Sequence, residues 1–227
     1  MKGIAPRRLR ILFAVMRCPA CRHPALEHDQ ACTQCGFSLD ALAQSMGIPP
    51  MLSGPVADVA KVLSKGRRHS VQRAVHALHQ RFPQVSFASV LADLSPEVPL
   101  ALHAFWLFNK GSLFSAVERG GDNRGVLFLV DVPRSRAVAM IGYGLEPFVN
   151  ETILEVCLNA ASGSLAKEDF AASIESFIRE LERQITTIVQ QLPQALGYVE
   201  DKLWVDSSLG EDVAPSLQTV GGSDDLY

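Results

Sequence analysis

Several features that assign a function directly are missing from this sequence of 227 residues. No apolar run approaches the roughly 18–20 residues that a membrane-spanning helix needs, so we expect no membrane span. The formal net charge of −3 predicts no strong attraction to nucleic acid or acidic membranes. P-loop, Ser–His–Asp and complete Gly-x-Gly-x-x-Gly patterns are also absent, which leaves no familiar nucleotide or serine-hydrolase signature.

Cysteine is scarce too, but four of the five cysteines lie in one short segment. Cys18 and Cys21 form one pair, Cys32 and Cys35 form a second, and ten residues separate the pairs. A two-residue spacing lets both sulfurs of a pair turn toward one point, so two pairs supply the four thiolates of a tetrahedral zinc site. Gly36 follows the second pair, where the backbone must turn toward sulfur. The pattern predicts a structural Zn²⁺ with no open coordination position.

Two disulfides or two redox pairs are the alternatives to zinc. They require an oxidising compartment or a thioredoxin-like context, and neither is evident. The apolar stretch over residues 9–16 follows arginines but is short and has no small-residue cleavage pattern. We interpret it as a basic extension, or as residues upstream of a true start at Met16, and expect a cytoplasmic protein. Cys157 is predicted to be a small core residue.

Composition divides the chain into five segments. They are a basic extension (1–16), a zinc ribbon (17–38), a linker beginning with a short helix (39–69), an α/β domain (70–193) and an acidic tail expected to be largely disordered (194–227).

Apolar periodicity predicts the elements of the α/β domain. The predicted helices cover 70–82, 100–110, 151–161 and 168–192, and the predicted strands cover 85–94, 125–132 and 136–141. Strand 125–132 (GVLFLVDV) is apolar on both faces, which is typical of a central strand. The order α-β-α-β-β-α-α predicts a sheet with helices on both faces.

Two stretches of this domain resemble the TPM domain family. Residues 121–130 (GDNRGVLFLV) are similar to the family's DNG-VLLLV loop and strand, and residues 136–146 (RAVAMIGYGLE) end in its GYGLE motif. LFNK at 107–110 is similar to a helix end of the family, and KEDF at 167–170 is similar to the short segment before the family's last helix. The resemblance covers roughly 70–193 and implies an α/β/α sandwich with a central mixed sheet. It also implies varied roles, because some relatives look like acid phosphatases, others modulate receptors, and many bacterial members have no assigned role.

Three acids near the predicted strand ends are the candidate catalytic residues: Asp122, Asp131 and Glu146. If they converge, their carboxylates can hold Ca²⁺ or Mg²⁺, and such an ion can polarise a phosphate ester. The alternative gives each acid a structural place. In that case Asp122 forms a turn, Asp131 lies at a strand end that faces solvent, and Glu146 forms a cap or a salt bridge.

We therefore expect a zinc-ribbon TPM protein that acts as a non-catalytic protein-interaction or assembly module with a protein partner. The alternative is a divalent-metal-dependent acid phosphatase acting through Asp122, Asp131 and Glu146. A second alternative is nucleic-acid binding through a basic ribbon face of Arg17, Arg22 and His23, but the overall acidity disfavours a nucleic-acid partner.

Overall fold

The computed structural model describes residues 16–25, 29–49, 54–111, 113–114 and 124–195. The chain divides into two units, 1–188 and 189–227, and the fold described below belongs to the first. The predicted basic extension and acidic tail lie almost wholly outside the described residues. Within those described ranges, no helix combines the length and apolar character that crossing a bilayer requires.

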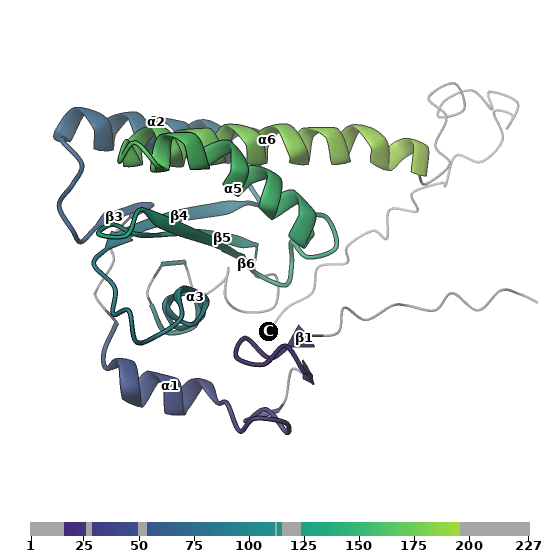
Figure 1. Cartoon of the computed structure of the whole chain (residues 1–227). Coiled ribbons are helices and arrows are strands. Elements are labelled where there is room, and N and C mark those ends of the chain that lie inside the picture. The colour runs from purple at the N-terminus through teal and green to yellow at the C-terminus, as the bar shows by residue number, and fades with distance from the viewer. Residues whose placement is uncertain (1–15, 26–28, 50–53, 112, 115–123, 196–227) are drawn as a thin grey trace, which may run out of the picture. The chain divides into compact units, whose positions relative to one another are not determined.

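A four-stranded mixed sheet forms the centre of the domain (Figure 1). Its strands, in spatial order, are β3 (Val56–Asp58), β4 (Ser86–Ala92), β5 (Gly125–Asp131) and β6 (Arg136–Ile141). β3, β4 and β5 run parallel, and β6 returns antiparallel beside β5. The mixed sheet implied by the family resemblance is therefore confirmed. The sequence analysis missed β3, which lies in the predicted linker, because three residues are too few for an alternating pattern.

Helices cover both faces of the sheet. One layer contains α2 (Lys65–Arg81), α5 (Glu151–Leu165) and part of α6 (Phe170–Ala195), and the other contains α3 (Leu100–Lys110) with α1 (Leu39–Met46) beyond it (Figure 1). From α2 onward the described elements follow the predicted order, and the predicted α/β/α sandwich is confirmed.

Three helices extend beyond their predicted bounds. α2 begins before Ser70 because the hydroxyl of Ser64 accepts a hydrogen bond from the N–H of Arg67 and caps the helix. The prediction that Gly163 breaks α5 was wrong. A helical glycine costs about 1 kcal/mol relative to alanine, and burial of Ala161 and Leu165 on either side outweighs that cost. α6 also continues past Pro193, which lies in its last turn.

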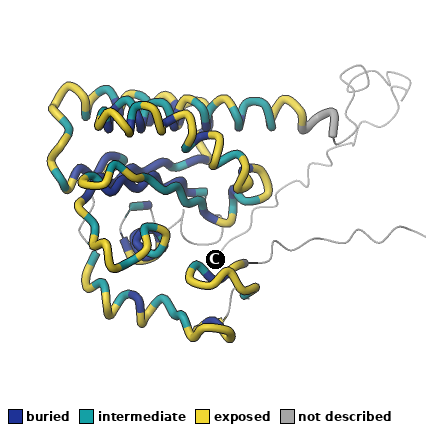
Figure 2. The backbone as a smooth tube through the Cα atoms, in the orientation of Figure 1, coloured by how far each residue is buried: buried dark blue, intermediate teal, exposed yellow. Residues whose placement is uncertain are grey.

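Alternating side chains of β5 reach two separate cores. Phe128 and its neighbours on one face join α2, α5 and α6, whereas Leu127 and Leu129 on the other face join α3. Every residue of β5 is buried, which gives the dark blue centre of Figure 2. The predicted central strand is therefore confirmed.

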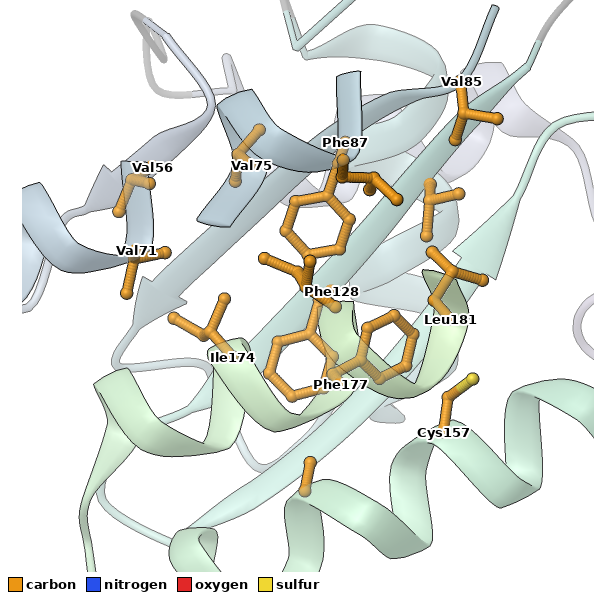
Figure 3. Packing of buried hydrophobic residues seen from close by; sticks show 14 of the residues in the cluster. Val56, Val71, Val75, Val85, Phe87, Phe128, Cys157, Ile174, Phe177 and Leu181 are labelled. Atoms are coloured by element: carbon orange, nitrogen blue, oxygen red, sulfur yellow. The ribbon is translucent and has the colours of Figure 1, made fainter. Parts of the chain in front are cut away.

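Aromatic packing fills the larger core. The ring of Phe177 lies 4.7 Å from that of Phe128 and 6.1 Å from that of Phe87, centre to centre (Figure 3). Cys157 is fully buried in the same core, as predicted. Burial raises the pKa of its thiol to about 12, so this cysteine stays protonated and is no nucleophile at neutral pH.

The Phe177→Ala substitution should lower the free energy of unfolding by about 3–5 kcal/mol, because it leaves a cavity where two aromatic neighbours met. Urea unfolding followed by circular dichroism measures this change. Val156→Ala is the matched control, since Val156 is 38% exposed on α5 and its truncation should change stability by less than about 0.5 kcal/mol. Equal effects of the two substitutions would contradict the packing described.

Candidate metal centre

Two backbone turns of the same form carry the four clustered cysteines. In the first turn the N–H of Arg22 donates to the carbonyl of Cys18 at 2.8 Å, and in the second the N–H of Gly36 donates to the carbonyl of Cys32 at 2.8 Å. A further backbone hydrogen bond closes each turn. The N–H of Cys18 donates to the carbonyl of His23, and the N–H of Cys32 donates to the carbonyl of Phe37. A short antiparallel pair, β1 (Met16–Arg17) with β2 (Pro24–Ala25), flanks the first turn. Local hydrogen bonding thus aims both sulfurs of each pair the same way.

The four sulfur atoms converge as a metal ion requires. All four ligand atoms lie within 4.8 Å of one another. The Sγ atoms of Cys18 and Cys35 are 3.7 Å apart, and so are those of Cys21 and Cys32. A tetrahedron with Zn–S bonds of about 2.3 Å has sulfur–sulfur edges of about 3.8 Å, so the geometry fits zinc. All five cysteines are free thiols rather than disulfides.

Within the metal-free cluster the thiols differ strongly in acidity. The backbone N–H groups of Cys35 and Gln34 lower the pKa of the Cys32 thiol to about 7, because they stabilise its thiolate. The backbone N–H of Phe37 lowers the pKa of Cys35, but the adjacent Cys21 thiol and burial outweigh it and raise that pKa to about 12. A metal ion entering the cluster must therefore displace protons.

Zinc affinity should fall as pH is lowered from 8 to 6. The thiol of Cys35, with its pKa of about 12, is protonated across this range, so zinc displaces its proton throughout. Below about pH 7 zinc must also displace the proton of Cys32. The apparent affinity should drop at least about tenfold per pH unit, more steeply below pH 7. Competition with a chromophoric chelator, corrected for its own protonation, measures this slope.

Cys157→Ala is the control for that titration, because Cys157 lies outside the cluster and its removal should leave the slope unchanged. An affinity that is constant between pH 6 and 8 would contradict binding through all four thiols.

Described contacts join the ribbon, and the helix α1 that follows it, to the α/β domain. The ring of Phe37 meets that of Phe105 on α3 edge-on, with ring centres 5.7 Å apart. Two ion pairs flank this contact, Arg22 with Glu151 at 3.2 Å and Lys110 with Asp40 at 3.1 Å. The ion pairs are largely exposed and contribute little to stability, so the apolar contact is the main attachment.

A cleft of about 580 Å³ lies between the ribbon, α3 and the end of β6. Arg17 and Arg22 of the ribbon, Phe105 of α3, and Tyr143 and Glu146 after β6 are among the residues that line it. Burial raises the pKa of the Glu146 carboxyl. Sequence analysis did not find this cleft, because three segments far apart in the chain form its walls.

The structure does not bring Asp131 and Glu146 together. Asp131 lies opposite Arg136 at one end of the β5–β6 pair, whereas Glu146 follows the other end, where the N–H of Gly142 bonds the carbonyl of Gly125. Asp122 lies outside the described residues. Among the parts of the chain that the structure describes, the four cysteines are the only group of three or more residues placed to hold a metal.

The environment of Asp131 also differs from both sequence-based interpretations. Its carboxylate accepts hydrogen bonds from Arg134 at 3.1 and 3.2 Å and pairs with Arg136 at 3.7 Å. The side chain is only 2% exposed, so the expectation of a solvent-facing strand end was wrong. Asp131 instead holds together the turn between β5 and β6.

Comparison with known proteins identifies the α/β domain. The family model of the TPM domain matches residues 56–184, which is more than half of the chain. The chain belongs to the TPM domain family. The four cysteines precede the matched range, so the cysteine cluster lies outside the part of the chain that matches the TPM domain. No curated protein matches the chain.

Solved structures of low sequence identity have a similar fold. The BA42 protein from the psychrophilic bacterium Bizionia argentinensis is 15% identical, with a TM-score of 0.50, covering 57% of this chain and 86% of that one. The N-terminal domain of a P. gingivalis protein is 17% identical, with a TM-score of 0.46, covering 60% and 83%. The N-terminal domain of the cg2496 protein from Corynebacterium glutamicum is 16% identical, with a TM-score of 0.44, covering 60% and 82%.

Proposed function

We propose that this TPM protein is a non-catalytic protein-interaction or assembly module. The observation that carries the proposal is the closed four-cysteine cluster. Four thiolates fill the coordination of zinc, so the ion has no position left for a substrate or an activated water. A metal in this site therefore stabilises a surface rather than performing a reaction.

The surroundings of the cluster support the same role. Segment 17–38 is too short to bury a core of its own, so zinc binding supplies most of its folding free energy. Beyond it, Tyr143 and Phe148 follow β6 with 49% and 45% of their surface exposed. Exposed aromatic side chains are enriched where proteins meet. Reduced thiolates also suit the cytoplasm, which we propose as the compartment.

A divalent-metal-dependent acid phosphatase is the second candidate. The raised pKa of Glu146 favours it, because a carboxyl that keeps its proton to higher pH can act as an acid. Glu146 follows β6 at the sheet end where β5 begins, and Asp122 precedes β5 in the sequence. These two acids, without Asp131, are the residues that such an activity would use with Ca²⁺ or Mg²⁺.

A pull-down from the native cell tests the proposed module. Tagged, zinc-loaded full chain should recover a protein partner in near-stoichiometric amount. The double substitution of Cys21→Ser and Cys35→Ser should abolish recovery, because it removes two zinc ligands, whereas Cys157→Ala should keep it. Recovery of no partner by the zinc-loaded chain would overturn the proposal.

Phosphatase activity is tested with p-nitrophenyl phosphate, with and without Mg²⁺ or Ca²⁺. We expect no metal-dependent turnover above that of the Asp122→Ala and Glu146→Gln variants, since neither acid serves a reaction in the proposed module. Turnover that requires the metal and falls at least about a hundredfold in both variants, a loss on the scale of general acid–base catalysis, would establish the second candidate instead.

A further inference from the structure

The cleft beside the ribbon has the size and chemistry of a binding site. Its volume of about 580 Å³ lies within the roughly 300–1,000 Å³ typical of ligand pockets. Phe37, Phe105 and Met140 give it an apolar floor, and all three are only partly buried, so part of their surface remains available. Arg17 and Arg22 stand on its ribbon side.

The backbone of Arg22 adopts a conformation that glycine would adopt at lower cost. Arg22 has a φ of 61°, and Gly36, at the same position of the second turn, has a φ of 70°. The left-handed region costs a residue other than glycine about 1–2 kcal/mol. Glycine would therefore suit the first turn better, as it does the second.

The ion pair of Arg22 with Glu151 does not offset this strain. Both side chains are about three-quarters exposed, at 76% and 74%, and such pairs contribute little in water. A strained residue whose side chain makes only an exposed ion pair points to a further use for that side chain. Arg22 is one of the residues that line the cleft, which is therefore where we place that use.

The charge on the ribbon side of the cleft is positive. Arg17 donates a hydrogen bond to the backbone carbonyl of Arg22, which places two arginines side by side, and no ion pair is found for Arg17 within the described ranges. Asp29 of the ribbon and Glu146 after β6 also line the cleft, so the ribbon side carries two positive charges and one negative charge.

We propose that this cleft binds an acidic peptide segment of a partner protein. A peptide carboxylate lies on the guanidinium groups of Arg17 and Arg22, which bind carboxylates in a forked geometry. An adjacent apolar side chain of the peptide rests on Phe37, Phe105 and Met140. The inference rests on the proposed interaction module and names the chemistry of its partner. Because Cys18 and Cys32 line the same cleft, zinc sets the position of both arginines.

The test is a selection from a phage-displayed library of random 12-residue peptides on the zinc-loaded full chain. We expect enrichment of peptides that join Asp or Glu to Leu or Phe. The enriched peptide, labelled with fluorescein, should bind in fluorescence polarisation with an affinity that falls with salt. Enrichment of basic peptides, or of none, would overturn the inference.

Arg22→Gly separates a binding role from a structural one. It relieves the left-handed strain, so zinc affinity should hold or rise, yet peptide affinity should fall at least tenfold. Arg17→Ala should also weaken the peptide at least tenfold. Arg73→Ala is the matched control, because Arg73 is exposed on α2, on the opposite face of the sheet. This substitution should leave both the peptide affinity and the zinc affinity unchanged. Unchanged peptide affinity in both Arg17→Ala and Arg22→Gly would overturn the assignment of the two arginines to peptide binding.

Two further results separate the possible failures. If the pull-down recovers a natural partner equally with the wild-type chain and with Arg22→Gly, binding of the partner in the cleft is refuted, whereas the proposed interaction module is not. Replacing the acids of residues 200–227 by their amides tests the chain's own acidic segment as occupant. We expect the affinity for the selected peptide to stay the same, and a tenfold rise would overturn the assignment to a partner.

Discussion

Convergence of four sulfur atoms on one point is the constraint on which the structure of the ribbon depends. Segment 17–38 contains too few apolar residues to fold around a core, and its four cysteines are positioned to bind a metal ion that can take the place of a core. The two turns that aim the sulfurs also place Arg22 and Phe37 directly after them. One of these residues lines the cleft with charge and the other attaches the ribbon to α3.

The TPM domain supplies a rigid support for that ribbon. β5 is buried along its whole length and divides the apolar side chains between two cores. The smaller core includes α3, which carries Phe105 and therefore one wall of the cleft. The domain is thus held together by ordinary packing, whereas the ribbon has four converging cysteines in place of a core, and the cleft lies where the two meet.

The two candidate functions place different demands on the acids around the sheet. Asp131 is held by two arginines in the turn between β5 and β6, which is a structural use of a buried carboxylate. Glu146 lies at the far end of the same strand pair, in a position whose burial raises its pKa. A shared site for these two acids is excluded by the length of the strands between them, so a phosphatase activity would have to use Glu146 without Asp131.

Local spacing along the chain determined much of this protein by itself. Two cysteine pairs with two-residue gaps predicted the metal cluster, because such spacing acts within a single backbone turn. The helix over 100–110 and the strand over 136–141 were predicted at their observed bounds, since their apolar patterns are strong and short-range. Tertiary structure alone decided the rest. The short edge strand β3, the separation of Asp131 from Glu146 and the walls of the cleft depend on strand register and on packing between distant segments, which no local pattern encodes.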